Sequence, residues 1–408
     1  MKSSIMMAVE DIAGEGVSAV LDRVTRYGVG AVTVAAAYHR ARDVTPHGAQ
    51  RVKTRYDGLH SVVDPNLFGA LVPPQLPGHQ AIDDLSAALG GRGLALNGWG
   101  VFCHNTTIGE AHPSATQENC FGDRAAPADL CPSQPSVAEY ARGLAISIAR
   151  LDVETVFAES LHFGSFDHGY HHERSFVPLS AMDRYVLGVC FCGYCCRLAS
   201  ERSVDAAQAR LEACRAVEPA LNGLPGPDVA VAPEVVADRV GDSFARYVLS
   251  RVATVTELAQ SVGEAVENEG VGLTFLDMTG AAKGYADGEP GGSLAVSDSW
   301  QSGVDVAAIS ATGSVHAIGV LAYARSTARV AADVRAYRRA IGPGTDLRVL
   351  LRPSLPDCVD ADALVDHLRA VRAADGDAVD YYHYGLCTLV DLDRIRVANG
   401  TRDPNGTA

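Results

Sequence analysis

The chain has 408 residues, 47% of them hydrophobic and 20% charged, which is the composition of an ordinary globular protein with a large core. A formal net charge of −15 at pH 7 argues against nucleic acid or an anionic membrane surface as a partner. No stretch approaches the ~20 apolar residues of a membrane span, and the start of the chain lacks the pattern of a secretory signal, so we expect a cytoplasmic protein.

Short apolar runs alternate with longer helical segments in chain order. The expected strands are 3–9, 31–39, 94–105, 154–163, 271–280, a sixth region made of 304–310 and 315–324, 346–355 and 378–386. The clearest expected helices between them are 16–28, 81–93, 136–151 and 237–269. This alternation predicts βαβ units with parallel strands, and eight such units predict an α/β fold, a closed (β/α)8 TIM barrel. No G-x-G-x-x-G motif follows the first strand, so a dinucleotide-binding fold has no support.

The domain organisation is expected to be simple. Residues 1–398 form one barrel domain, with an insertion at about 164–236 after the fourth strand. A Pro- and Gly-rich stretch at 218–234 is too short for a linker and is interpreted as a loop of this insertion. Residues 399–408 are expected to form a flexible tail.

Four of the ten cysteines follow a metal-binding pattern. Cys190, Cys192 and Cys195 form the run CFCGYC, and Cys131 lies upstream in LCPSQP. Three thiols within six residues can converge on one ion, and a fourth from a distant loop completes a tetrahedral set of sulfur ligands that suits Zn²⁺. Four thiolates leave no open position for water, so this zinc is expected to be structural.

The active site of a (β/α)8 barrel lies at the C-terminal ends of its strands, and these ends are polar here. Glu159 interrupts the apolar run TVFAES, where a carboxylate costs free energy unless it is paired or functional. Asp277 in LTFLDMTG follows the same logic. We interpret the two as a catalytic pair, whose separation would distinguish retention (~5 Å) from inversion (~6.5–9.5 Å). The alternative is structural, with Glu159 paired to a basic residue and Asp277 in a turn.

Other polar and aromatic residues near the strand ends are expected to bind the substrate. Histidines, tyrosines and an asparagine that converge there suit a polyhydroxylated ligand, because aromatic faces pack against sugar C–H groups. The candidates are His39, His104, Asn105, His162, Asp167, His168, Lys283, Tyr323, Arg352 and Tyr384.

The loop HFGSFDHGYHHER allows a second interpretation. Asp167, His168, His171 and His172 could bind a catalytic metal, and His168 and His172 have H-x-x-x-H spacing. However, Gly169 breaks a helical pattern, and the glutamate of the H-E-x-x-H motif is missing. Substrate contacts or surface positions are therefore the favoured interpretation of these histidines.

The cysteines and Glu159 together resemble a known family. Between about 94 and 200, the order of Cys131, Glu159 and CFCGYC is similar to that of the zinc-containing bacterial β-galactosidases, glycoside hydrolase family forty-two. The resemblance implies structural zinc on the four cysteines and an acid/base role for Glu159. Over its whole length the chain also looks like a less defined group of TIM-barrel proteins described as glycoside hydrolases, through segments such as FCHNTTIGEAHP, LCPSQP and AESLHFGSFDHGYHHE.

The chain departs from the β-galactosidases at two positions. Ala158 precedes Glu159, where the family has a sugar-binding Asn. The seventh strand, LRVLLRPSL, offers Arg352 and no carboxylate, where the family has its Glu nucleophile. A retaining β-galactosidase mechanism is therefore not expected, although the zinc architecture matches.

The favoured function is a glycoside hydrolase-like enzyme that cleaves a small glycoside by carboxylate acid/base catalysis. The missing carboxylate of the seventh strand and the histidine-rich loop keep open a non-hydrolytic isomerase, epimerase or lyase that acts on a sugar-like metabolite. A catalytically inactive carbohydrate-binding barrel is the third alternative. The expected partner is thus a small-molecule glycoside or sugar-like metabolite, with no nucleic acid and no membrane, and a homo-oligomer is left open.

Overall fold

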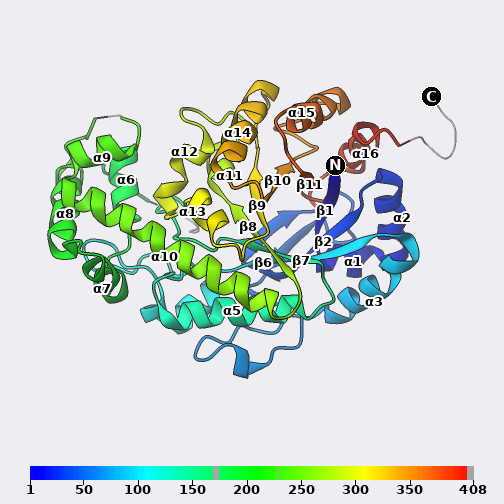
Figure 1. Ribbon diagram of the computed structural model, residues 1–408, viewed down its shortest axis with the longest axis horizontal. Coiled ribbons are helices and arrows are strands. Elements are labelled where there is room, and N and C mark those ends of the chain that lie inside the picture. Colours follow the sequence, from blue (N-terminus) through cyan, green and yellow to red (C-terminus); the bar gives the residue numbers. More distant parts are fainter. Residues whose placement is uncertain (169–173, 228, 402–408) are drawn as a thin grey trace.

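The computed structural model describes residues 1–168, 174–227 and 229–401. Eight parallel strands close into a barrel, because β1 pairs with both β2 and β11 (Figure 1). In order around the barrel they are β1 (Lys2–Ala8), β2 (Ala31–Tyr38), β6 (Ala95–Val101), β7 (Thr155–Glu159), β8 (Gly272–Asp277), β9 (Ala317–Leu321), β10 (Asp346–Leu351) and β11 (Ala378–Tyr381). The predicted (β/α)8 TIM barrel is confirmed.

Helices lie between the strands and cover the outside of the barrel (Figure 1). In chain order they are α1 (Val9–Glu15), α2 (Val17–Tyr27), α3 (His79–Leu89), α4 (Thr106–Ala111), α5 (Pro135–Ala149), α10 (Asp242–Glu267), α11 (Thr279–Gly284), α12 (Ala295–Asp298), α13 (Val306–Ala311), α14 (Thr327–Ala340), α15 (Ala361–Ala373) and α16 (Leu389–Ala398). Short 3₁₀ turns lie at Pro65–Leu67, Gly90–Arg92, Pro113–Ala115 and Ser299–Ser302. After β2, an antiparallel hairpin of β3 (Ala41–Val44) and β4 (Val52–Arg55) precedes β5 (Gly58–Leu59), which adds to β2.

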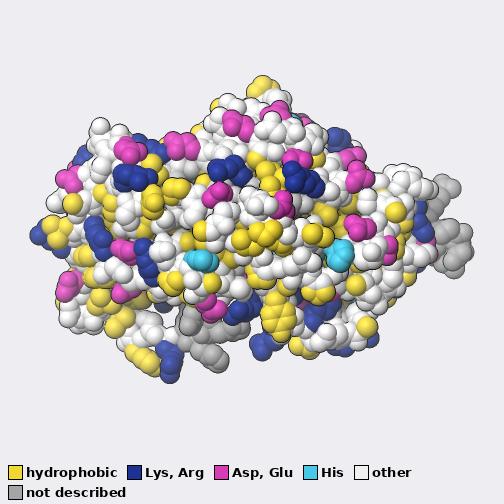
Figure 2. Space-filling model, turned by 90° about the horizontal axis from the view of Figure 1, so that it is seen from below, with side chains coloured by type: hydrophobic (Ala, Val, Ile, Leu, Met, Phe, Trp, Pro, Cys, Tyr) yellow, Lys and Arg dark blue, Asp and Glu magenta, His cyan; other side chains and the backbone are white. Residues whose placement is uncertain are grey.

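The region between β7 and β8 carries its own helices, α6 (Ala181–Leu187), α7 (Gly193–Glu201), α8 (Ala206–Leu221) and α9 (Pro233–Arg239). Helices α8 and α9 pack on the long α10 and form the left end of the molecule in Figure 1. Among the described residues, no helix combines the length and the apolar character that crossing a membrane requires. On the face shown in Figure 2, acidic and basic side chains are interspersed with hydrophobic ones.

The chain end that was predicted to be a flexible tail is described only as far as residue 401. Up to that point it is anchored, because Asn399 Nδ2 donates to the carbonyl of Tyr27 and the Tyr381 hydroxyl donates to Asn399 Oδ1, each at 3.0 Å. Residues 402–408 lie outside the described residues.

Two predicted elements differ from the structure. Region 304–310, predicted to belong to the sixth strand, forms helix α13, because the Asp305 carboxylate accepts hydrogen bonds from the N–H groups of Ala307 and Ala308 and caps the helix. The helix predicted over 237–269 is divided at Gly241, where φ is +146°, into the end of α9 and the long α10. A side chain at Gly241 would strain the backbone at this φ, and its Cβ would lie 2.3 Å from a carboxylate oxygen of Glu212, which would have to move.

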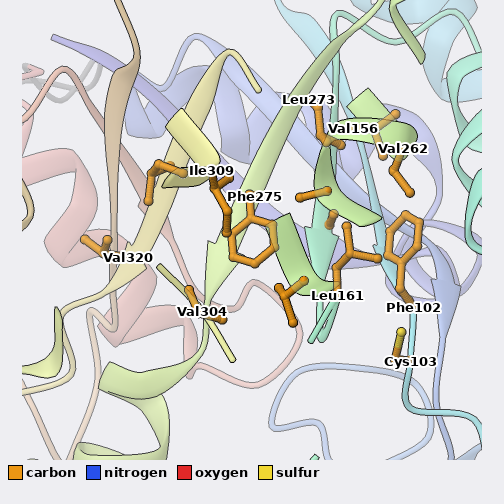
Figure 3. Packing of buried hydrophobic residues seen from close by; sticks show 14 of the residues in the cluster. Phe102, Cys103, Val156, Leu161, Val262, Leu273, Phe275, Val304, Ile309 and Val320 are labelled. Carbon is orange, nitrogen blue, oxygen red and sulfur yellow. The ribbon is translucent and has the colours of Figure 1, made fainter. Parts of the chain in front are cut away.

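Hydrophobic residues form two layers, one outside the barrel strands and one inside. Along β8, Leu273 and Phe275 belong to the outer layer, while Leu276 belongs to the inner one. Figure 3 shows part of the outer layer, with Leu273, Phe275, Val156 and Val320. The inner cluster consists of Met6, Ala35, Trp99, Phe157, Leu276, Ala281, Leu321, Tyr323 and Leu350. The same alternation decides which side chains at the strand ends face the barrel mouth.

Candidate active site and metal centre

Glu159 ends β7 at the C-terminal mouth of the barrel, on the same inner face of the strand as Phe157. Its Oε2 accepts a 2.7 Å hydrogen bond from the indole Nε1 of Trp99, which is fully buried in the neighbouring strand β6. Burial raises the pKa of the Glu159 carboxyl to about 7, and the Trp99 hydrogen bond and the charge of His104 offset this only in part. The acid form of Glu159 therefore persists to neutral pH, as a general acid requires.

Four aromatic rings gather at this carboxyl group. The ring centroids of Tyr38 and Trp99 are 5.0 Å apart, and Tyr382 lies 6.1 Å from both Trp99 and Tyr323. Burial raises the pKa of all three tyrosines, and the neighbouring Glu159 charge raises it further. The Tyr323 hydroxyl is buried and has no hydrogen-bond partner among the described residues. The site is thus walled by aromatic rings and carries a few polar groups, as small-molecule sites do.

A second group of polar side chains lies beside Glu159. His104 Nδ1 is 3.1 Å from Asp129 Oδ1, and the His104 ring lies 5.2 Å from the ring of His39 and 5.0 Å from that of His168. Burial, and secondarily the charge of His104, lowers the pKa of His39 to about 4, so His39 is neutral at pH 7. The structure therefore brings three of the predicted histidines together near the predicted acid.

Two further predicted residues lie at the edge of this site. Nδ1 of His162 is 2.8 Å from the carbonyl oxygen of Phe163, and its Nε2 is buried with no partner among the described residues. Burial lowers the pKa of His162. Arg352 donates twice to Asp357, at 2.7 Å each, and its guanidinium lies 4.2 Å from the centroid of the Tyr323 ring. Arg352 thus supports the wall that Tyr323 forms.

Asp277 lies apart from Glu159. It follows the inward-facing Leu276 on β8, so its own side chain points to the outer layer, where it is buried. Its Oδ2 accepts a 2.9 Å bond from the hydroxyl of Tyr337 on α14, and its Oδ1 accepts from the backbone N–H and the hydroxyl of Thr279 at 3.0 and 2.6 Å. These three bonds occupy both oxygens. The structure does not bring the two predicted carboxylates into one pocket.

Two of the predicted sugar contacts face the outer layer as well. The Asn105 side chain caps α4 by accepting from the N–H of Ile108 at 2.9 Å. The Tyr384 hydroxyl accepts from Arg23 at 2.7 Å and donates to Glu15 at 3.2 Å. Because β11 ends at Tyr381, Tyr384 lies beyond the strand. It is Tyr382 that reaches the mouth.

Lys283 and Asp167 also have partners outside the Glu159 cluster. Lys283, on α11, is bonded to Asp298 of α12. The exposed Asp167 accepts a 2.8 Å bond from Arg184 of α6. Neither residue contacts the aromatic wall in these interactions.

The predicted site residues do not include Tyr38, Trp99, Tyr382 and Asp129. Trp99 could have been found from the alternation of side chains along a strand, because residues two positions apart face the same side and Asn97 faces inward. The same alternation does not predict Tyr38. The register of β2 against β6 shifts between residues 35 and 37, so the side chains after the shift face the opposite side. Asp129 lies in a long loop, where no local pattern identifies it.

Cys131, Cys190, Cys192 and Cys195 are buried, and their sulfur atoms all lie within 4.8 Å of one another. The Sγ atom of Cys131 is 3.7, 3.6 and 3.4 Å from those of Cys190, Cys192 and Cys195. A tetrahedral ion with bonds of about 2.3 Å to sulfur needs sulfurs about 3.8 Å apart, so the four thiols fit one ion. The four cysteines can therefore hold a metal ion, with one ligand before α5 and three at the start of α7.

Polar groups also contact two of the four sulfur atoms. The backbone N–H of Glu118 donates to Cys190 Sγ at 3.3 Å, and Ser133 Oγ lies 3.0 Å from Cys195 Sγ. Within residues 1–168, 174–227 and 229–401, no other group of three or more His, Cys, Asp or Glu comes as close together. His171 and His172, which the second interpretation of the histidine-rich loop needs, lie outside the described residues.

No protein-family model matches the chain, and no curated protein matches its sequence. The fold is similar to that of the catalytic domain of beta-amylase from Paenibacillus polymyxa, with a TM-score of 0.56 over 98% of this chain and 99% of that one. Alpha-L-fucosidase isoenzyme 2 from Paenibacillus thiaminolyticus gives a TM-score of 0.54 over 98% of this chain, which spans about half (49%) of the fucosidase chain. Sequence identity is 10% in both cases, so what the chain shares with these two structures is the barrel fold.

Proposed function

We propose that the protein is a glycoside hydrolase-like enzyme in which Glu159 is the general acid. One observation carries the proposal: a carboxyl group whose pKa burial raises to about 7 lies at the C-terminal mouth of the barrel, held by Trp99. Such a group can give its proton to the oxygen of the departing group, which is the acid half of glycosidic bond cleavage.

The walls of the site support a small glycoside as substrate. Tyr38, Trp99, Tyr323 and Tyr382 offer aromatic faces for the C–H groups of a sugar, and the neutral His39 can exchange hydrogen bonds with its hydroxyls. Both fold neighbours carry the names of glycosidases, which agrees with this substrate class. The buried position of Asp277 leaves it a structural role in this proposal.

The four-cysteine centre is proposed to hold a structural Zn²⁺. Four thiolates saturate the ion, so it supplies a cross-link and no activated water. The cross-link would join Cys131, before α5, to the three cysteines at the start of α7. Since Asp129 lies two residues before Cys131, the ion would also steady the loop beside Glu159.

The histidine cluster favours a second candidate, an isomerase or epimerase of a sugar-like metabolite. Glu159 beside His104 is a pair that could move a proton between two carbon positions of a sugar. Product analysis separates the two candidates, because only the hydrolase releases a free alcohol and a reducing sugar.

The proposed function is tested with a panel of 4-nitrophenyl glycosides and the variant Glu159→Gln. We expect kcat to fall about 10²–10⁴-fold, the usual contribution of a general acid. Glu154→Gln is the matched control, because Glu154 is an exposed glutamate just before the same strand, at the opposite end of the barrel. It should keep wild-type turnover.

The leaving group makes the test sharper. A 2,4-dinitrophenyl group departs without protonation, so Glu159→Gln should cleave the 2,4-dinitrophenyl glycoside far better than the 4-nitrophenyl one. Equal turnover by Glu159→Gln and Glu154→Gln would exclude Glu159 as the acid. The absence of turnover by the wild type on the whole panel would count against the hydrolase.

A further inference from the structure

We infer that His104, held by Asp129, is the general base that works with Glu159, so that the glycoside is cleaved in one displacement with inversion at the anomeric carbon. The inference rests on the proposed function, in which Glu159 is the acid. The role of general base is assigned to His104, because the predicted base Asp277 has its carboxylate bonded to Tyr337 in the outer layer.

The Asp129 carboxylate orients the His104 ring. The two side chains are 11% and 5% exposed, and 3.1 Å separates Nδ1 from Oδ1. Two backbone hydrogen bonds of 2.9 Å hold the chain around these residues. The N–H of Leu130 donates to the carbonyl of Cys103, which joins the segments of Asp129 and His104. The N–H of Gln117 donates to the carbonyl of Asp129. An Nδ1 hydrogen donated to Asp129 would orient the neutral form of the ring with its lone pair on Nε2, where a base needs it.

The segments that carry the base and the acid run side by side. The N–H groups of Phe102 and Cys103 donate to the carbonyls of Glu159 and Ser160, each at 2.9 Å. His104 follows directly, close enough for its charge to act on Glu159. The two groups therefore come from adjacent strand ends and share one mouth.

Several charged and titratable groups surround His104. His39 and His168 face the ring at 5.2 and 5.0 Å, and Asp129 holds Nδ1. His162 lies within electrostatic reach of His104. Among the described residues, no group forms a hydrogen bond with His104 Nε2. In the inferred arrangement, this nitrogen receives the attacking water molecule.

A pocket borders Asp129, the partner of His104. Asp129 and His168 line a pocket of about 260 Å³ between the loop after β6 and the insertion. Gly164 permits the close approach of the loop after β7, since a Cβ there would lie 2.3 Å from the Asp129 carboxyl carbon. A water molecule occupies about 30 Å³, so the pocket has room for water molecules beside Asp129 and His168.

In the proposed step, the water oxygen bonds to the anomeric carbon while the glycosidic C–O bond breaks. His104 Nε2 takes a proton from the water, and Glu159 gives its proton to the departing oxygen. Asp129 stabilises the imidazolium that forms, as the acidic partner of a histidine base does. The proton then returns through solvent to the Glu159 carboxylate, so atoms and charges balance with water as the only co-reactant.

The first test needs no variant. Proton NMR during turnover of the 4-nitrophenyl glycoside by the wild-type enzyme identifies the anomer that is released first. We expect the opposite configuration to that of the substrate. Release of the retained anomer would overturn the inference, because it requires a covalent intermediate on a nucleophile.

The second test uses His104→Gln and Asp129→Asn on the same substrate. We expect kcat to fall about 10²–10⁴-fold in His104→Gln with KM within about threefold, and a smaller fall of kcat at unchanged KM in Asp129→Asn. His112→Gln, an exposed histidine after α4, is the control. If His104→Gln keeps turnover while Glu159→Gln loses it, the base is wrong and the acid stands. If Glu159→Gln also keeps turnover, the proposed function fails.

Discussion

At the residue scale, Glu159 lowers the stability of the folded protein at neutral pH. A glutamate in an unfolded chain has a pKa of about 4.3, while burial raises the pKa of Glu159 to about 7 in the folded state. Between these values the folded state keeps a proton that the unfolded state has lost. The free energy of unfolding therefore decreases as the pH rises from about 4 to 7. The aromatic wall that desolvates the carboxyl group is the physical cause.

Replacing the carboxyl with an amide should remove this penalty. We expect Glu159→Gln and the wild type to have similar unfolding free energies near pH 4.5, and the variant to be more stable by up to about 3 kcal/mol at pH 8. The amide oxygen can still accept the bond from Trp99. Urea unfolding across this pH range measures the difference. An equal gain in Glu154→Gln, or none in Glu159→Gln, would show that burial of Glu159 is not its source.

At the element scale, the four cysteines bring together parts of the chain that are far apart in the sequence. Cys131 precedes α5, while Cys190, Cys192 and Cys195 lie at the start of α7. The hydroxyl of Tyr247 on α10 donates to the carbonyl of Cys190 at 2.7 Å. A metal ion at this centre would therefore brace the insertion against both α5 and α10.

Cys192→Ser should release that brace. We expect metal content to fall from one zinc per chain to well below one. The free energy of unfolding should fall by on the order of 4 kcal/mol, which is the stabilisation that a ligand gives when its concentration is about a thousand times its Kd. Elemental analysis and limited proteolysis of the insertion measure the two effects. Cys196→Ser is the control, because Cys196 lies next to the centre but outside it. A full complement of metal in Cys192→Ser would exclude it as a ligand.

At the scale of the whole molecule, polar side chains close the barrel at the end opposite to the candidate site. Asp380 of β11 is fully buried and accepts from Arg348 of β10 at 2.9 and 2.6 Å. Ser4 of β1 also donates to Asp380 and lies 2.8 Å from the hydroxyl of Thr33 on β2. Four consecutive strands, including the β1–β11 seam, are thus tied together around one carboxylate.

Removal of this carboxylate should loosen the whole barrel. Asp380→Ala leaves Arg348 buried without its partner, so we expect a loss of about 3–5 kcal/mol in the free energy of unfolding. Turnover per folded molecule should be unchanged, because the site lies at the other end of the strands. Urea unfolding is the measurement, and Asp346→Ala, an exposed position at the start of β10, is the control. A loss below about 1 kcal/mol would mean that the seam is held by backbone pairing alone.

The amino-acid sequence by itself determined the barrel, the cysteine cluster and the candidate acid. Apolar periodicity is a local property, so it located all eight strands. It failed where Asp305 caps a helix inside an apolar run and where Gly241 divides a predicted helix. Three of the four clustered cysteines are close in the chain, which makes their convergence on one ion a local property too. Glu159 was recognisable because a carboxylate at the end of a buried strand is costly.

Only the tertiary structure decided which groups lie around Glu159. The side chain of Asp277 points outward because side chains alternate between the two faces of a strand. The side chain of Tyr38 points inward because the register of β2 shifts against the neighbouring strand β6. The pairing of Asp129 with His104 depends on a long loop that folds back on the end of β6. Contacts between residues far apart in the chain form only when the barrel closes. For this reason the sequence paired Glu159 with Asp277 and indicated His104 only as a substrate contact, without Asp129.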